Sequence, residues 1–293
     1  MNAVPEFHLF LPQMRLTHEA LVERAQGAEA AGFTGIALMD HLAPPMAESH
    51  AMFDAMTTAA WLAAHTETLT IGHLVLCDSF RHPAVLAKQV VSLDHASAGR
   101  FELGIGWGSV VAEFDRFGIG STEAPTRVQR LGETLEVVQA LWSGETVDFT
   151  GVHHHIEGAQ QRPVPLRDIP IVIGGAGPRT LELVAEHATW WNCPLYALDR
   201  FDALRPKTGE ARASTQEMVA FVADPTTRDE VVGLATKRFG TMGGGLVAGD
   251  ADELLVHYHD LHDRGVERIY VWFADFAPPA TLTAFGQQVI AGY

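Results

Sequence analysis

The pattern with the clearest chemical meaning is a glycine-rich turn between an apolar segment and a helix start. Residues 169–174 are apolar and predict a buried strand, and the helix that follows opens with proline, which favours the first helical position. Glycines let a ligand approach the backbone closely, and the free N–H groups at a helix start attract an anion. The turn therefore predicts a phosphate site formed by Gly174, Gly175, Ala176, Gly177, Pro178, Arg179 and Thr180.

Two other interpretations of this turn were weighed against a phosphate site. It begins like a dinucleotide-binding fingerprint, but Thr180 takes the third glycine position and Asn192 stands where a ribose-binding acid is expected. An ordinary glycine-rich turn between strand and helix is the other alternative. The combination of strand, glycines and helix start favours phosphate binding.

Asp40 and His41 form the second candidate site, directly after the apolar segment 35–39. A histidine exchanges protons near neutral pH, and a carboxylate can orient it or the neighbouring backbone. Adjacent residues on a strand point in opposite directions, so we expect one of the two side chains to face a pocket. A structural histidine is the alternative. We predict a catalytic role for both residues.

Other patterns carry less information. The glycines at 104, 106 and 108 around Trp107 fit close approach of a flat ligand, but they also fit close strand packing. The run His153–His155 alternates sides in a predicted hairpin, and the pair His259 and His262 lacks a convincing third metal ligand. The sequence therefore predicts no metal site.

The elements that must position these residues alternate between apolar strands and helices. Strands are expected at residues 7–11, 35–39, 69–76, 101–106, 169–174, 189–192, 215–223 and 268–273. Helical patterns separate them, among them 83–98, 124–143, 178–187 and 251–264. Eight such strands predict an α/β fold, a (β/α)₈ TIM barrel, whose active site lies at the carboxyl ends of the strands.

Two segments exceed a minimal barrel, and no Ser/Pro/Gly linker divides the chain. Residues 107–123 are an insertion after strand four, and residues 145–158 form a predicted β-hairpin before strand five. Long loops of this kind usually serve function or an interface. We expect one domain over residues 1–293.

Composition narrows the function classes further. The 293 residues are 47% hydrophobic, and 20 Lys+Arg against 36 Asp+Glu give 20 − 36 = −16. This acidic balance disfavours a nucleic-acid binder. The two cysteines, Cys77 and Cys193, cannot build a disulfide framework. The first six residues lack a signal-peptide pattern, and no apolar run reaches the length of a membrane span. The expected protein is cytoplasmic, with no nucleic-acid or membrane partner.

Taken together, several segments resemble the luciferase-like monooxygenase family, which includes coenzyme F420-dependent oxidoreductases. The match covers about residues 7–195, and the last third of the chain matches only weakly. The matching segments are Leu9-Phe10-Leu11-Pro12-Gln13, Ala30-Ala31-Gly32-Phe33, Asp40-His41-Leu42, Phe80-Arg81-His82-Pro83, Ser97-Ala98-Gly99-Arg100-Phe101, Arg130-Leu131-Gly132-Glu133, Ile173-Gly174-Gly175-Ala176-Gly177-Pro178-Arg179 and Trp190-Trp191-Asn192.

The resemblance implies a barrel that binds a reduced flavin or deazaflavin with its ring in the mouth. The glycine turn would then hold the cofactor phosphate. A non-proline cis peptide behind the ring, as in F420-binding relatives, would fall near Leu74 and Val75. Cys77, Gly106 and Trp107 would border the ring, and His41 would face the substrate.

The function implied by the resemblance is hydride transfer between reduced coenzyme F420 and a small organic substrate. An FMN-dependent, two-component monooxygenase that uses O₂ is the alternative, and a non-catalytic flavin-binding barrel is another. The resemblance also implies a homodimer and, for the alternative, a separate cofactor reductase. The branch acting on a sugar phosphate has a glutamate where this chain has Ser109, and it uses lysines that are nearly absent here. We therefore do not expect that substrate.

Overall fold

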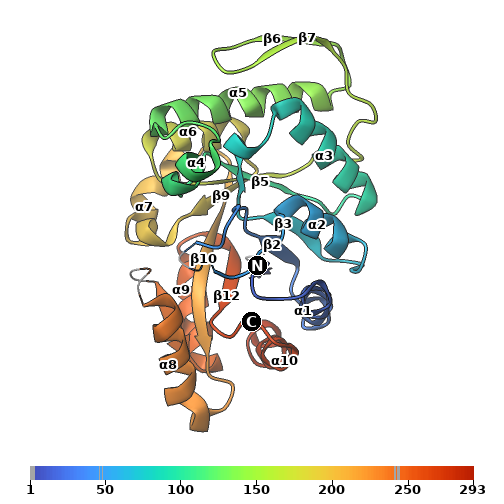
Figure 1. Cartoon of the computed structure of the whole chain (residues 1–293). Coiled ribbons are helices and arrows are strands. Elements are labelled where there is room, and N and C mark those ends of the chain that lie inside the picture. Colours follow the sequence, from blue (N-terminus) through green and yellow to red (C-terminus); the bar gives the residue numbers. More distant parts are fainter. Residues whose placement is uncertain (1–3, 46, 48, 241, 243–244) are drawn as a thin grey trace.

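A parallel β-barrel surrounded by helices forms the body of the protein in the computed structural model (Figure 1). The structure describes residues 4–45, 47, 49–240, 242 and 245–293, so residues 1–3 of the amino-terminal segment lie outside it. Within the described residues the strands pair in the order β3-β2-β1-β12-β10-β9-β8-β5-β4. Their bounds are β1 Glu6–Phe10, β2 Gly35–Leu38, β3 Thr70–His73, β4 Leu76–Cys77, β5 Leu103–Gly106, β8 Ile171–Gly174, β9 Trp190–Cys193, β10 Arg212–Phe221 and β12 Val266–Phe273. The α/β barrel expected from the sequence is confirmed.

The third strand of the barrel is interrupted. The sequence predicted one strand over 69–76, but a cis peptide bond between Leu74 and Val75 separates β3 from β4. β4 pairs with β5, and β3 reaches the same neighbour through a single parallel bridge between Ile71 and Phe101. The two short strands therefore act as one, and together they close the ring between β2 and β5.

Helices cover the outside of the barrel, and their sequence signals are well marked. Thr17 caps α1 by accepting a hydrogen bond from the Ala20 N–H at 3.2 Å, and Pro83 and Pro178 open α3 and α6. The helices are α1 His18–Ala30, α2 Ala55–Ala63, α3 Pro83–Ala96, α4 Val111–Phe117, α5 Ala124–Trp142, α6 Pro178–His187, α7 Phe201–Leu204, α8 Arg228–Phe239, α9 Ala251–Asp263 and α10 Pro279–Gln288. None of these helices has the length and apolar run that a membrane span requires.

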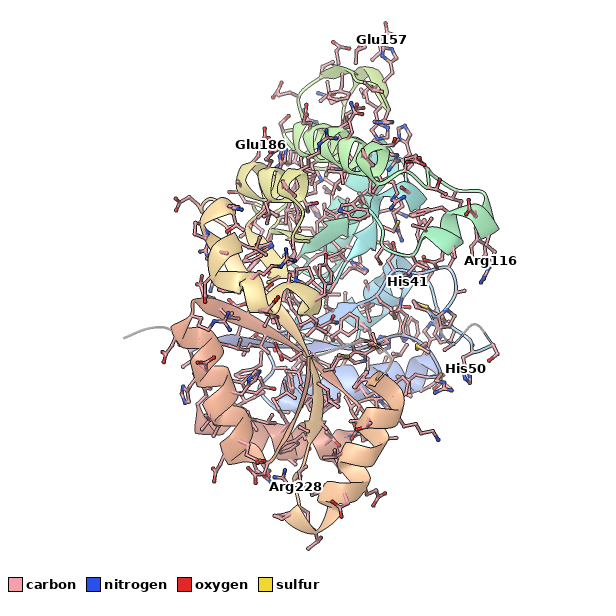
Figure 2. The ribbon with its side chains drawn as sticks, turned by 90° about the vertical axis from the view of Figure 1, so that its left-hand side faces the viewer. His41, His50, Arg116, Glu157, Glu186 and Arg228 are labelled. Atoms are coloured by element: carbon pink, nitrogen blue, oxygen red, sulfur yellow. The ribbon has the colours of Figure 1, made fainter. Side chains whose placement is uncertain are left out.

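Both expected insertions are present. The first contains α4, and the second is the antiparallel hairpin β6 Val147–Thr150 and β7 His155–Ala159. The hairpin projects beyond α5 (Figure 1). Figure 2 shows Glu157 of this hairpin at one end of the molecule and Arg228 of α8 at the opposite end. The Glu133 carboxylate on α5 accepts hydrogen bonds from the backbone N–H groups of residues 152–154, which fastens the hairpin to the helix.

The last third of the chain departs most from the sequence prediction. The predicted strand 215–223 begins earlier, at Arg212, because residues 212–215 pair with β9 before residues 218–221 pair with a further strand. That strand, β11 Leu246–Gly249, was not predicted. It is only four residues long and half-exposed, so it lacks the strong apolar pattern of the barrel strands.

A buried ionic network fills the barrel interior near the amino ends of β1, β5 and β12. Arg268 forms a bidentate pair with Glu102 at 2.7 and 3.0 Å and also pairs with Glu6. His8 lies beside them and is only 2% exposed. Burial and the neighbouring Arg268 lower the pKa of His8 to about 4. This network lies at the end of the barrel that normally serves stability.

Candidate active site

Asp40 ties the end of β2 to the segment that follows β4. It is buried, and its Oδ2 accepts a hydrogen bond from the backbone N–H of Cys77 at 2.7 Å. Both terminal nitrogens of the Arg81 guanidinium donate to the same carboxylate, at 2.5 and 2.9 Å. These contacts occupy both oxygens of Asp40. Asp40 thus holds the segment after β2, which includes its neighbour His41, against the rim, and its catalytic role stays a prediction.

That neighbour, His41, is paired with a carboxylate that the sequence did not single out. Its Nδ1 lies 2.7 Å from Oε2 of Glu113 on α4, and the two side chains are 17% and 8% exposed. An ionised carboxylate can only accept hydrogen bonds, so Nδ1 carries the proton. The other ring nitrogen, Nε2, is thereby left for exchange with a ligand.

Glu113 is held in its ionised form by several donors. Its Oε1 accepts hydrogen bonds from the backbone N–H groups of Leu42 and Ala43 at 2.8 and 3.3 Å. Burial opposes ionisation, but the hydrogen bond from His41 and these two backbone donors lower the pKa of Glu113. The sequence offered one signal for this residue, an acidic side chain within the first insertion. The sequence alone did not show which strand end α4 covers.

The ends of β4 and β5 form a tightly packed part of the rim. Leu74 and Val75 flank the cis peptide where the resemblance to F420-binding proteins implied one. A side chain at Gly106 would lie 2.7 Å from the Val75 methyl, and one at Gly108 would lie 2.8 Å from the Cys77 sulfur. Glycine is therefore required for this packing, which was one of the two interpretations of the glycine run.

Cys77 belongs to this rim as a neutral thiol. Its side chain is buried, and burial raises the pKa of the Cys77 thiol to about 12. A thiol with so high a pKa is a poor nucleophile. The geometry gives no support to covalent chemistry, and the contact with the cofactor ring that the resemblance implied for Cys77 stays a prediction.

The glycine turn adjoins the same rim through Trp107. The indole Nε1 of Trp107 donates to the hydroxyl of Thr180 at 3.2 Å, which links the loop after β5 to the first turn of α6. Gly175 has φ +144°, and a side chain there would lie 2.7 Å from the Thr180 methyl. At Gly177 the nearest atom to an added Cβ would be 3.8 Å away. Position 175 therefore requires glycine, whereas position 177 has room for a side chain.

The start of α6 has the features of an anion site. Gly177 is the N-cap residue and offers no capping side chain, and Pro178 and Arg179 are exposed. The first N–H groups of a helix attract negative charge when no side chain caps them. The described geometry therefore brings together the residues predicted for phosphate binding, although it does not test that role.

Arg127 on α5 is a second residue that sequence reasoning missed. Its side chain is 2% exposed, and its guanidinium lies over the rings of Trp107 and Phe114, with 5.1 and 4.9 Å to the ring centroids. One nitrogen donates to the Ser121 carbonyl at 2.9 Å, and Nε has no hydrogen-bond partner among the described residues. A buried cation with an unused donor beside Trp107 fits a nearby anion.

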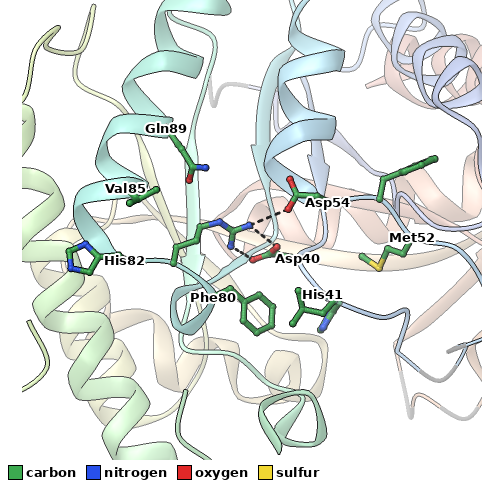
Figure 3. A pocket seen from close by; sticks show the side chains of 11 residues that line it. Asp40, His41, Met52, Asp54, Phe80, His82, Val85 and Gln89 are labelled. Atoms are coloured by element: carbon green, nitrogen blue, oxygen red, sulfur yellow. Dashed lines mark hydrogen bonds and ion pairs between the residues drawn. The ribbon is translucent and has the colours of Figure 1, made fainter. Parts of the chain in front are cut away.

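A cavity of about 450 Å³ opens beside His41 (Figure 3). It lies between the segment after β2 and the start of α3. Its lining consists of Asp40, His41, Leu42, Met52, Phe53, Asp54, Phe80, Arg81, His82, Val85 and Gln89. None of the predicted cofactor-binding residues is among them. Asp40 and His41, the two residues predicted to be catalytic, are both among them.

Comparison with known proteins decides the family. The family model for luciferase-like monooxygenases matches residues 6–227. The chain belongs to the luciferase-like monooxygenase family. It is accordingly an oxidoreductase of the luciferase-like type, built on the barrel described above.

The related sequences include F420-dependent dehydrogenases. An F420-dependent glucose-6-phosphate dehydrogenase of Microbacterium testaceum is 29% identical over 88% of this chain and 68% of its own length. An F420-dependent hydroxymycolic acid dehydrogenase of Mycobacterium tuberculosis is 30% identical over 82% of this chain and 65% of its own length. This luciferase-like chain spans about half to two thirds of the length of the curated relatives it matches.

A solved structure agrees with this placement at the level of the fold. An F420-dependent secondary alcohol dehydrogenase in complex with an F420-acetone adduct superposes with a TM-score of 0.84, over 99% of this chain and 100% of the other. The two sequences are 16% identical. At that identity the likeness establishes the shared barrel, and the activity has to be argued from the residues of this luciferase-like chain.

Proposed function

We propose that this protein transfers a hydride between coenzyme F420 and a small alcohol or carbonyl compound. The pairing of His41 with Glu113 at the barrel rim, on the same side as the open start of α6, carries the proposal. It places a proton-exchanging group and an anion-attracting turn at the carboxyl ends of the strands, where barrel enzymes have their active sites. The F420-dependent relatives at about 30% identity support the choice of cofactor.

The residues present fit an anionic cofactor with a flat ring. Gly177 leaves the start of α6 uncapped and open, and Arg127 has a buried nitrogen without a partner. We assign the phosphate to the turn Gly174–Thr180 with Arg127 nearby, and the ring to the half-buried surface of Leu74 and Val75 between Cys77 and Trp107. Bound there, the deazaflavin ring would supply a carbon that accepts or gives a hydride.

His41 supplies the proton chemistry. In alcohol oxidation Nε2 would take the proton of the substrate hydroxyl, and the bound cofactor would supply the hydride acceptor. In the reverse direction Nε2 returns the proton to the carbonyl oxygen. The Glu113 carboxylate stabilises the positive charge that the ring carries after it accepts the proton. Asp40 keeps the backbone of His41 in place through its contacts with Cys77 and Arg81.

Cofactor titration tests the proposal. The purified protein is titrated with oxidised F420 and, separately, with FMN, and quenching of the ligand fluorescence is followed. Saturable quenching of F420 at a lower concentration than FMN is expected. Tight binding of FMN with no binding of F420 would overturn the proposal in favour of the flavin-dependent monooxygenase.

A further inference from the structure

We call the cavity beside His41, with the lining given above, the His41 cavity. Its lining contains two carboxylates and one guanidinium. Arg81 is the one arginine or lysine among its described lining residues, and Asp40 holds two of its nitrogens. A second carboxylate, Asp54, lies 3.9 Å from the same guanidinium. Two carboxylates thus face one guanidinium that is already engaged. An added anion would find no unpaired arginine or lysine among the described lining residues.

Asp54 is ionised and keeps part of its hydrogen-bonding capacity. Its Oδ1 accepts a hydrogen bond from the Thr57 N–H at 2.7 Å and caps α2. Burial opposes ionisation, but the bond from Thr57 and the charge of Arg81 lower the pKa of Asp54. The Asp54 side chain is 57% exposed, so it can still take a further donor from the cavity.

A buried acceptor without a partner points the same way. The side-chain oxygen of Gln89 is shielded from solvent and has no hydrogen-bond donor among the described residues. Gln89 and Asp54 both line the cavity, and Figure 3 shows Gln89 on α3 and Asp54 at the start of α2. An unpaired buried acceptor costs free energy, which a ligand hydroxyl or ammonium group removes. The lining also contains apolar side chains, namely Leu42, Met52, Phe53, Phe80 and Val85, which suit a short hydrocarbon chain.

We propose that the His41 cavity is the substrate pocket and that it selects uncharged alcohols and amino alcohols over anionic ones. The inference rests on the proposed function. The substrate hydroxyl would point to His41, and its chain or amino group would reach toward Gln89 and Asp54. Oxidation would break the O–H bond and the C–H bond of the carbinol carbon and form the C=O bond of a ketone, with the proton going to His41 and the hydride to oxidised F420, which would be reduced. Phosphate esters and carboxylates are disfavoured by Asp54.

A matched series of probes tests this selectivity. The probes are 2-hexanol, 1-amino-2-hexanol, 2-hydroxyhexanoate and glucose 6-phosphate, each tried with the protein and oxidised F420. Binding is followed by saturation-transfer NMR and turnover by loss of F420 absorbance. The neutral and amino alcohols should exceed the two anions in kcat/KM by about a hundredfold, which is the scale of an uncompensated like-charge contact.

Two variants, each with a matched control, separate an effect on substrate selectivity from an effect on folding. Asp54→Asn preserves the helix cap, because asparagine is also a good N-cap residue, but it removes the charge. It should reduce the preference for 1-amino-2-hexanol over 2-hexanol about tenfold. Asp250→Asn, at the N-cap of α9, should leave that preference unchanged. Val85→Trp should block 2-hexanol, whereas Val256→Trp on α9 should not.

The outcomes separate this inference from the proposed function. Failure to bind F420 would remove the proposed function itself. Binding of F420 together with faster turnover of 2-hydroxyhexanoate or glucose 6-phosphate would overturn the substrate selectivity and leave the cofactor assignment standing. Binding of F420 with no binding of either alcohol would overturn it as well.

Discussion

The Nδ1 atom of His41 and the Oε2 atom of Glu113 lie 2.7 Å apart, although the two residues are 72 positions apart in the chain. His41 lies just beyond the end of β2, and Glu113 lies on the short helix α4 inserted after β5. The second oxygen of Glu113 accepts hydrogen bonds from the two backbone N–H groups that follow His41. One carboxylate therefore fixes both the ring of His41 and the backbone next to it.

The first prediction concerns this carboxylate. Glu113→Gln keeps the size of the side chain but removes the charge that stabilises protonated His41. We expect turnover of an accepted substrate to fall about 10- to 100-fold, with the affinity for F420 unchanged, because a carboxylate that orients and charges a functional histidine contributes on that scale. The pH dependence of kcat should also shift. A fall in turnover with an unchanged pH profile would assign Glu113 a structural role only.

Selective isotope labelling offers a readout of the same contact that needs no substrate. In ¹⁵N-histidine-labelled protein, the His41 ring should show a proton on Nδ1, and the Nδ1 resonance should move in Glu113→Gln, because the charged acceptor of its hydrogen bond is replaced by a neutral one. The His41 resonances are assigned as those that disappear from the spectrum of His41→Ala. A His41 signal that does not respond to Glu113→Gln would contradict the geometry.

The second prediction concerns His41 itself. His41→Ala removes the proposed proton acceptor and leaves the cofactor turn intact. Turnover should fall by roughly 10²- to 10⁴-fold, the usual contribution of a general acid or base, with a much smaller change in F420 affinity. Steady-state kinetics and fluorescence titration on the same preparation give both values. An unchanged rate would return His41 to a structural role.

The third prediction tests the glycine turn. A side chain at Gly177 meets open space, with the nearest atom 3.8 Å from the added Cβ, so Gly177→Asp should fold. Aspartate is a favourable N-cap, and its carboxylate would occupy the start of α6 where the cofactor phosphate is expected to bind. F420 binding should be lost while the melting temperature holds or rises. Gly177→Ser is the neutral control and should retain most of the affinity.

The fourth prediction concerns stability at acidic pH. In the folded protein His8 has a pKa of about 4, well below the ordinary histidine value of 6.5 that applies to the unfolded chain. Below pH 6.5 His8 binds a proton in the unfolded chain, whereas in the folded protein it stays neutral down to about pH 4. The free energy of unfolding therefore decreases as the pH falls through this window. This lowering of the His8 pKa, from 6.5 to about 4, corresponds to a loss of about 3 kcal/mol in the free energy of unfolding.

Urea unfolding at several pH values measures this loss. His8→Gln should show a shallower decrease between pH 6.5 and 4 than the parent protein, because it cannot take up this proton on unfolding. The same substitution at the exposed His259 is the control and should leave the decrease in place. Equal slopes for His8→Gln and the parent would refute the assignment.

The barrel and its helices followed from local patterns in the sequence. Apolar runs such as those ending at Asp40 and Gly106 mark buried strands, and Thr17, Pro83 and Pro178 mark helix starts. The glycine turn was found because its residues are contiguous. β11 was missed because a short, half-exposed strand has no distinct pattern, and it forms only through pairing with β10.

The contacts that complete the site were not predictable in the same way. Glu113 and Arg127 lie on helices whose position over the barrel depends on packing of the first insertion. Their partners, His41 and Trp107, come from other parts of the chain. For Asp40 the sequence showed the position but not the partners. Its place after a strand suggested catalysis, but its oxygens accept hydrogen bonds from Cys77 and Arg81.

The most direct test of the central claim compares the two cofactors with and without oxygen. The protein is loaded with reduced F420 or reduced FMN, and a neutral ketone such as 2-hexanone is added anaerobically and then in air. The account predicts that the ketone oxidises F420 anaerobically to give 2-hexanol, and that oxygen changes the rate little. An oxygenated product formed only with FMN and oxygen would contradict it.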